Sequence, residues 1–187
     1  MRYLLLGFYF IAGSVSANKL FVGYDLGEMA FNDFRHFSGE AGLSFEDSWR
    51  LTIAHMNVAA TEAHLSSNFA TAVDGDGVEG DIYGYELFLT KPFYSGWYLG
   101  GSVGYYSNEY RNIHTKQSLS NSSPTIGIKA GYRQESAFGV PFLYWDLGVP
   151  FRYTIDHYDD TELGDATVKS NQFENNIWFN IGLLLQI

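Results

Sequence analysis

His64, Ser66 and Glu79 are the residues of this 187-residue chain whose types and spacing could support covalent catalysis. His64 and Ser66 stand close together, Asn68 follows, and Glu79 lies further downstream. A serine nucleophile needs a base to take its proton and an acid to orient that base, so the group could form a hydrolase triad. Short patterns of this kind also occur in ordinary polar loops. We favour the polar loop and expect no catalytic residue, with the triad as the alternative.

Two further groups of residues could hold a cation. The acidic, glycine-rich run 74–81 offers oxygen ligands on a flexible backbone, but its spacing departs from the twelve-residue calcium loop. We interpret it as a solvated turn; a bound divalent cation is the alternative. Four histidines in polar connecting segments show no shared ligand spacing: His36, His64, His114 and His157. We therefore expect no metal and no cofactor.

Eight segments that could position these residues alternate apolar and polar side chains with a period of two, which predicts β-strands. In the last of them the odd positions from Ile177 to Ile187 are all large and apolar. We expect this terminal strand to pair with the first. The predicted strands are 19–31, 38–45, 49–57, 82–92, 96–107, 124–133, 141–153 and 173–187.

The connections between these strands alternate in length. Three are short, and three are long and polar, at 58–81, 108–123 and 154–172, while the first outer connection, 32–37, is a brief exception. This pattern is typical of an up-and-down antiparallel barrel with both termini on the inner side. The sequence thus predicts an all-β fold, an eight-stranded antiparallel up-and-down transmembrane β-barrel.

The two faces of the predicted strands differ in charge. The face we assign to lipid carries no charge, as expected if a Lys or Arg at mid-depth costs about 2–4 kcal/mol. His55 falls on this face, so we expect either that the third strand ends before it or that a bulge shifts its register. The opposite face carries glycines and a predicted lumen charge network of Asp25, Glu40, Arg50, Glu86, Lys129, Arg133, Asp146 and Arg152.

These lumen charges allow two interpretations. They could line a proton or ion path, or they could pair in a structural network that fills the barrel. Eight strands enclose only enough space for their own side chains, so we favour the structural network and a sealed polar lumen.

The N-terminus resembles a secretory signal peptide. Residues 1–17 have Arg2 as their only charge, an apolar run from Tyr3 to Ala12, and small residues at Val15 and Ala17. We expect cleavage after Ala17, leaving one outer-membrane barrel domain, residues 18–187. A net charge of −10 argues against nucleic acid as a partner, and the absence of cysteine fits an exported chain.

Taken together, the signal peptide, eight alternating strands, short inner turns, long outer loops and apolar terminal strand resemble the small OmpA/OmpX-like outer-membrane barrels of Gram-negative bacteria. The resemblance covers the whole mature chain. It implies integral outer-membrane localisation, contact with lipid and lipopolysaccharide, and insertion by the barrel-assembly machinery. One departure is Ile187, which stands where that family usually ends on an aromatic residue.

We therefore expect a structural or surface-interaction protein, whose long loops present a surface to a host or phage ligand. Two alternatives remain open. The pattern at His64, Ser66 and Asn68 is similar to that of outer-membrane lipid A deacylases, which use a Ser, His and Glu triad, although that family carries it near the C-terminus. A soluble lipocalin-like carrier also has eight strands, but its apolar face would point inward.

Overall fold

The computed structural model describes residues 17–46, 48–65, 73–156, 159–169 and 173–187. Apart from Ala17, the predicted signal peptide lies outside these residues and stays a prediction. Within the described ranges, no helix combines the length and the apolar character needed to cross a membrane.

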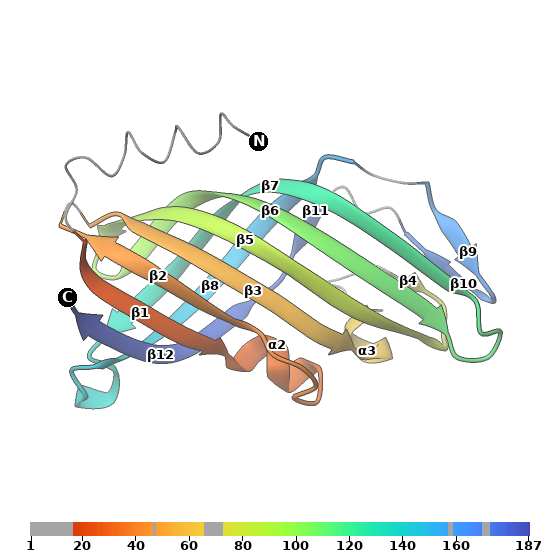
Figure 1. Ribbon diagram of the computed structural model, residues 1–187, viewed down its shortest axis with the longest axis horizontal. Coiled ribbons are helices and arrows are strands. Elements are labelled where there is room, and N and C mark those ends of the chain that lie inside the picture. The colour runs from red at the N-terminus through yellow and green to blue at the C-terminus, as the bar shows by residue number, and fades with distance from the viewer. Residues whose placement is uncertain (1–16, 47, 66–72, 157–158, 170–172) are drawn as a thin grey trace.

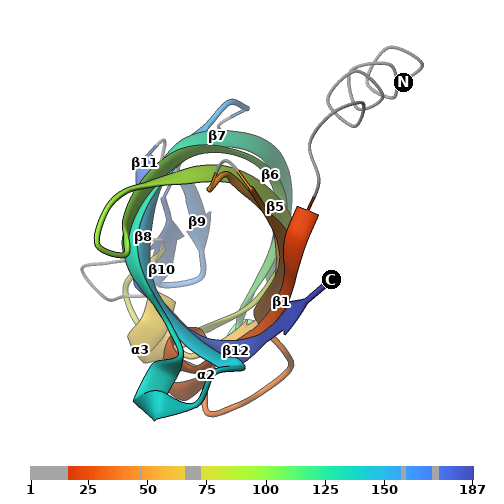
Figure 2. The ribbon, with the colours of Figure 1, turned by 90° about the vertical axis from the view of Figure 1, so that its left-hand side faces the viewer.

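Eight antiparallel strands form a closed ring, which Figure 2 shows from the end that carries the C-terminus. The first strand pairs with the last, with Gly23 opposite Gly182, so the predicted up-and-down barrel and its closure are confirmed. We call the end with the C-terminus and the short turns the inner end, and the opposite end the outer end (Figure 1). In ring order the strands are β1 (Ala17–Asp25), β2 (Gly39–Phe45), β3 (Arg50–Ala60), β5 (Val78–Tyr94), β6 (Trp97–Asn112), β7 (Ser118–Glu135), β8 (Leu143–Thr154) and β12 (Trp178–Gln186).

The predicted strand 173–187 is interrupted. Its first part, β11 (Phe173–Asn175), pairs with β8, and the same register resumes when Trp178 of β12 pairs with Gly148. This register brings Pro150 opposite the gap. Because proline has no backbone N–H to donate, the ladder lacks a bond at this point.

The first predicted strand ends earlier than expected. β1 stops at Asp25, and residues 26–31 form the helix α2 (Leu26–Phe31). The Asp25 carboxylate accepts a hydrogen bond of 3.0 Å from the Glu28 backbone N–H and so caps this helix. The period-two prediction through Phe31 was therefore wrong, and the first outer connection runs from Leu26 to Ser38 instead of being brief.

The predicted loop 108–123 is mostly strand. β6 and β7 remain paired out to Arg111 and Ser118, so that only residues 113–117 form the turn. The prediction of a loop was wrong because the paired ends of these two strands carry polar side chains, a composition that is also typical of connecting segments. The two strands form a long hairpin at the outer end (Figure 1).

The two other long connections fold into a small structure that we call the cap. It consists of the helix α3 (Glu62–Leu65) and a three-stranded sheet of β4 (Val73–Asp74), β10 (Ala166–Val168) and β9 (Thr161–Leu163). These elements lie at the outer end of the barrel (Figure 1). The cap packs on inward residues of the barrel strands, and the shared buried cluster is Ala60, Leu65, Val73, Val78, Tyr110, Leu163, Ala166 and Val168.

His55 faces outward from a regular strand. β3 continues to Ala60 and pairs with β2 and β5 without a shift in register. Both predicted explanations, an early strand end and a bulge, were therefore wrong. The imidazole stacks on the Tyr85 ring at 4.8 Å between ring centroids, so aromatic neighbours accommodate it on the outer face.

Candidate functional site

The eight charged residues predicted for the lumen are all buried, with side chains that extend from inward positions of six strands. The structure divides them into two ion-pair clusters and two separate sites. This division determines what the interior can do.

The inner cluster joins two acids and two bases. The Arg133 guanidinium donates to Glu40 Oε1 at 2.7 Å and to Asp146 Oδ2 at 2.8 Å. The Lys129 Nζ lies 3.6 Å from Asp146 Oδ1 and 3.8 Å from Glu40 Oε2. Two negative and two positive charges therefore balance inside the barrel, as burial of charge requires.

Two tyrosines complete this cluster. The Tyr98 hydroxyl donates to Asp146 Oδ1 at 2.7 Å, and the Tyr144 hydroxyl donates to Glu40 Oε1 at 2.9 Å. Glycine makes the necessary space: a Cβ at Gly148 would overlap both the Tyr98 hydroxyl and the Lys129 side chain. The glycines on the inward face thus have a packing role.

Aromatic rings surround the two cations of the inner cluster. The Arg133 guanidinium lies 4.2 Å from the Phe21 ring centroid, and the Lys129 Nζ lies 4.9 Å from that of Phe88 and 5.0 Å from that of Trp178. Cations over aromatic faces are stabilised by the ring quadrupole, the more so when desolvated. The cluster is therefore enclosed by rings.

The outer cluster is centred on Glu86 and Arg152. The Arg152 Nε and the Tyr106 hydroxyl both donate to Glu86 Oε2, at 2.7 and 2.8 Å. The Arg152 Nη1 also donates to Asn176 Oδ1 at 2.8 Å. Asn176 lies in the gap between β11 and β12, so this bond holds the interrupted strand against the interior.

Arg50 and Asp25 belong to neither cluster. Arg50 lies at the inner rim, where it and Lys19 bind Glu135 at 3.3 and 2.5 Å, and Asp25 caps α2. Lys19 and Glu135 were absent from the predicted network. Both lie on the inward face of their strands, so extending the parity analysis to the strand ends would have found them.

Apolar side chains fill the spaces between these charged groups. Near the inner end Phe21 and Tyr144 pack edge to face at 5.8 Å, together with Leu184. A second cluster packs around the charged groups and includes Met29 of α2; its Trp178 ring contacts both Lys129 and Arg152. Its members are Met29, Ala54, Met56, Val58, Phe88, Tyr106 and Trp178. Ion pairs, hydroxyls and rings in this arrangement hold the wall together.

The outer wall has an apolar band bounded by aromatic residues. Trp97, Tyr132 and Trp145 form an inner aromatic group, with ring centroids 5.4 and 5.3 Å apart. The outer aromatic group is Tyr24, Phe37, His55, Tyr83 and Tyr85. Exposed large side chains occupy the band between them: Val22, Ile53, Leu89, Leu99, Val103, Ile126, Ile128, Leu147 and Leu183.

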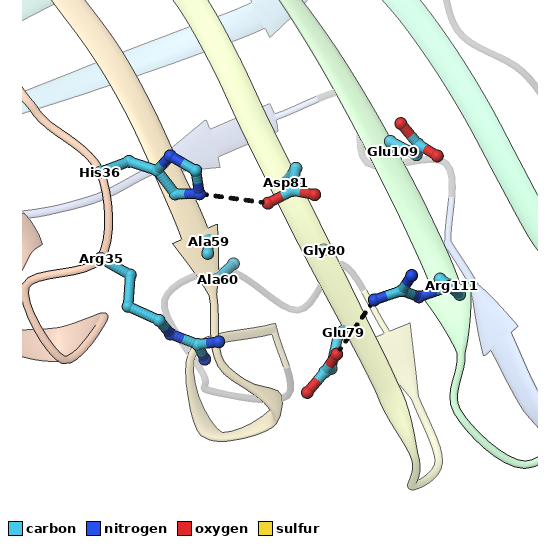
Figure 3. A pocket seen from close by; sticks show the side chains of 9 residues that line it. All are labelled: Arg35, His36, Ala59, Ala60, Glu79, Gly80, Asp81, Glu109 and Arg111. Atoms are coloured by element: carbon cyan, nitrogen blue, oxygen red, sulfur yellow. Dashed lines mark ion pairs between the residues drawn. The ribbon is translucent and has the colours of Figure 1, made fainter.

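A charged groove lies just beyond the outer aromatic group. It has a volume of about 230 Å³ and opens on the outward face of β3, β5 and β6 (Figure 3). The Asp81 carboxylate lies 3.8 Å from His36 Nε2, and the Glu79 carboxylate lies 3.5 Å from Arg111 Nη2. We call it the outer groove; its lining is Arg35, His36, Ala59, Ala60, Glu79, Gly80, Asp81, Glu109 and Arg111.

The alternative catalytic triad cannot be assembled from the described residues. Ser66 and the side chain of His64 lie outside them, and Glu79 is paired with Arg111 in the outer groove. The triad therefore stays an untested alternative.

The acidic run 74–81 is divided between two strands. Asp74 of β4 binds Lys169 at 2.9 Å, Gly75 and Gly77 form a turn with positive φ, and Asp81 lies in the outer groove. Within the described ranges, no three His, Cys, Asp or Glu side chains gather as metal ligands would.

Val168→Asp should open the cap without unfolding the barrel. Val168 is fully buried in the cap cluster, and an unpaired carboxylate there would lose its hydration. We expect protease cleavage within 159–169 to become at least tenfold faster, while heat-modifiable gel mobility is retained. Thr167→Asn is the control, because its side chain is on the opposite, less buried face of β10, and a neutral residue avoids repulsion from Asp74 and Glu162 across the sheet. Equal protease resistance in both variants would contradict an apolar cap core.

The fold and interior define a closed eight-stranded antiparallel barrel with an apolar wall and a filled, charge-balanced interior. No family model and no curated protein matches the sequence. Among solved structures, the chain is similar to Ail, the attachment invasion locus protein of Yersinia pestis, with 12% identity, coverage of 91% of this chain and 100% of that chain, and a TM-score of 0.46.

The same protein in complex with the heparin analogue sucrose octasulfate matches with 12% identity, the same coverage and a TM-score of 0.45. A major outer membrane protein from Thermus thermophilus matches with 13% identity, again over 91% of this chain and 100% of that chain, and a TM-score of 0.44.

Proposed function

We propose that this protein is an integral barrel of the bacterial outer membrane, of the OmpA/OmpX-like kind, with a sealed lumen and a surface-interaction role at its outer end. The observation that carries the proposal is the wall: an apolar band with an aromatic group at each edge. Transmembrane barrels present such a band to lipid, with aromatic girdles at both interfaces.

β7 illustrates the match between wall and bilayer. Its outward residues Ser118, Ser120 and Ser122 are polar, and those from Pro124 to Tyr132 are apolar or aromatic. A strand needs about 9–11 residues to cross a membrane, whereas β7 has 18. The serine half would therefore project beyond the lipid.

The interior supports a sealed barrel instead of a channel or carrier. Two ion-pair clusters and two apolar clusters occupy it, and eight strands leave no wide lumen. A lipocalin-like carrier would require the reverse distribution, with apolar side chains around an internal ligand and a polar wall.

The outer end supports the surface-interaction role. The cap is fixed to the barrel strands by a shared buried cluster, and the β6–β7 hairpin is hydrogen-bonded almost to its tip. Rigid elements present side chains to a partner at lower entropic cost than disordered loops do. A host or phage surface ligand would meet this preformed platform.

Membrane fractionation tests the location, and gel mobility tests the folded state. We expect the protein to be extracted from cells only with detergent and to migrate differently before and after heating. In planar bilayers it should show no stable conductance steps. Recovery in the periplasmic fraction would overturn the proposal. Mass analysis of lipid A from cells with and without the protein would reveal the deacylase alternative through lost acyl chains.

A further inference from the structure

The hydrogen-bonded ring is closed over only part of its height. The ladder of β1 with β12 ends at Asp25, and the ladder of β2 with β3 ends at His55. Beyond that level β3 continues over residues 56–60 and β11 runs along β8, and neither has a neighbouring strand on its other side. Within the described ranges, α2 and residues 32–38 fill the wall between these two edges (Figure 1). We call residues 26–38 the side plug.

Side-chain hydrogen bonds join the side plug to both edges of this gap. Toward β3, the Thr61 N–H donates to Asn32 Oδ1 at 3.3 Å, and toward β11, Asn176 Nδ2 donates to Glu28 Oε2 at 3.5 Å. Both distances exceed the usual N–H···O range of about 2.7–3.2 Å, so each bond is weak. The side plug can therefore open at a lower free energy than the strand ladders beside it.

The far end of the side plug has an anchor and a strained turn. His36 forms an isolated β-bridge with Val58 of β3. Just before it, Asp33 and Phe34 have φ values of 54° and 55°, in the left-handed region that non-glycine residues rarely adopt. Leaving this conformation relieves backbone strain, so these two residues can act as a hinge between α2 and the anchor.

Met29 is the apolar residue of the side plug that enters the barrel. It is fully buried, whereas Phe31, two residues later, is 69% exposed. Methionine is unbranched and flexible, and it packs much as a short alkyl chain does. Met29 thus occupies a site whose shape and polarity suit an alkyl group. The buried neighbours of Met29 in its cluster are Ala54, Met56, Val58, Phe88, Tyr106 and Trp178.

The edge of this site is polar and charge-balanced. Trp178 Nε1 is buried and has no hydrogen-bond partner in the part of the chain that the structure describes. The Trp178 ring also contacts Lys129 and Arg152, which the carboxylates of the two ion-pair clusters already balance. A charged ligand would add an unpaired buried charge. The ligand that fits is therefore neutral, with an alkyl chain and an oxygen that can accept from Trp178.

We propose that the side plug opens toward the membrane and that a neutral aliphatic molecule, such as a medium-chain alcohol or ester, replaces Met29 in the cluster. The inference rests on the proposed membrane location, because Phe37 places the side plug at the outer aromatic group. The alkyl chain packs against Ala54, Met56 and Phe88. The ladders below the side plug stay intact, so the site is a lateral pocket and not a channel.

Quenching of Trp178 fluorescence by a brominated ligand tests this site. The full mature chain, with Trp49→Phe, Trp97→Phe and Trp145→Phe, keeps Trp178 as its sole tryptophan and is inserted in phosphatidylcholine vesicles. The probe is a medium-chain alcohol brominated within its chain. In a parallel arm the acyl chains of the phosphatidylcholine carry the bromine, which distinguishes a free ligand from bilayer lipid. Bromine quenches a tryptophan only near contact, and Trp178 is 3% exposed.

Two substitutions in this single-tryptophan chain should change the affinity in opposite directions. Ala54→Leu fills the site from β3, and we expect the alcohol to bind at least tenfold more weakly. Met29→Ala removes the competing side chain, and we expect at least tenfold tighter binding. Ala130→Leu is the matched control, because it makes the same change on the outward face of β7. It should leave the quenching unchanged.

Absence of quenching in the single-tryptophan chain, or equal quenching in Ala54→Leu and Ala130→Leu, would overturn the site. Equally strong quenching by the brominated phosphatidylcholine would make the occupant a bilayer lipid and overturn the assignment to a free aliphatic molecule. Heat-modifiable gel mobility shows whether each variant folds. If Ala54→Leu does not fold, Met29→Ala decides, and an unchanged affinity there would overturn the site.

The proposed location is judged separately. A heat-modifiable barrel that inserts in the vesicles without quenching by the alcohol leaves the membrane assignment intact and refutes only the side plug. Failure of the unmodified chain to insert would refute the membrane assignment, and the lateral site with it.

Discussion

Arg133→Met should destabilise the folded barrel by about 3–5 kcal/mol, because it leaves two buried carboxylates with only one cation to balance them. Arg133 donates to both Glu40 and Asp146, and its removal leaves two negative charges facing Lys129 alone. Methionine keeps the apolar stem but neither the charge nor the hydrogen bonds. Urea unfolding of the protein in lipid vesicles measures the change in the free energy of unfolding.

Arg111→Met is the matched control for this experiment. It makes the same chemical change in the exposed pair with Glu79, where an ion pair contributes at most about 1 kcal/mol. Comparable destabilisation by the two substitutions would show that the inner cluster is hydrated and that the lumen is not packed as described.

The double variant Glu40→Gln, Arg133→Met would separate stability from the effect of an orphaned charge, because it removes one charge of each sign and leaves Lys129 paired with Asp146 at 3.6 Å. Removing the partners of a buried ion pair together is often close to neutral, since no uncompensated charge remains. We expect this variant to recover much of the stability lost in Arg133→Met. The ion pairs would then act mainly to select one arrangement of the wall, with the rings around Lys129 and Arg133 supplying the packing.

Side-chain parity explains what the sequence predicts well. Along a strand the side chains alternate between faces, so a list of odd and even positions assigns each residue to the wall or the interior. Trp178 and Leu184, which interrupt the apolar pattern of the last strand, are buried in the interior, as their even numbers require. The eight lumen charges follow the same rule.

Parity does not give the height of a residue along the barrel axis. Height depends on the stagger of neighbouring strands, which a barrel fixes as a whole. Arg50 and Lys129 share a face, yet Arg50 binds Glu135 at the rim while Lys129 lies among Phe88 and Trp178. The sequence therefore predicts the members of the network without their partners.

The cap and α2 were missed for a different reason. Both are short elements whose stability comes from tertiary packing, as with Met29, which is buried against barrel residues. Local polarity at 58–81 and 154–172 obscured the few apolar residues, such as Leu163 and Val168, that form the cap core. The sequence does contain one local signal for α2. An Asp followed three residues later by a Glu, as in Asp25 and Glu28, is typical of a helix N-terminus.

Ile128→Arg should test the depth of the wall directly. Ile128 is exposed and lies at the middle of the outward apolar run of β7, level with Gly101 of β6. An arginine at the bilayer midplane costs about 2–4 kcal/mol, and the cost falls to about 0–1 kcal/mol near the interfaces. We expect Ile128→Arg to lower the free energy of unfolding, measured in lipid vesicles, by about 2–4 kcal/mol.

Ser120→Arg is the matched control for Ile128→Arg. Ser120 lies on the same face of the same strand but in the serine half, beyond the outer aromatic group. It should change stability by less than about 1 kcal/mol if that half projects into water. Equal costs at the two positions would contradict a bilayer boundary between Ser122 and Ile126. A large cost at Ile128 alone would place Asp81 beyond the lipid, because Asp81 of β5 is level with Ser120 through Glu109 of β6.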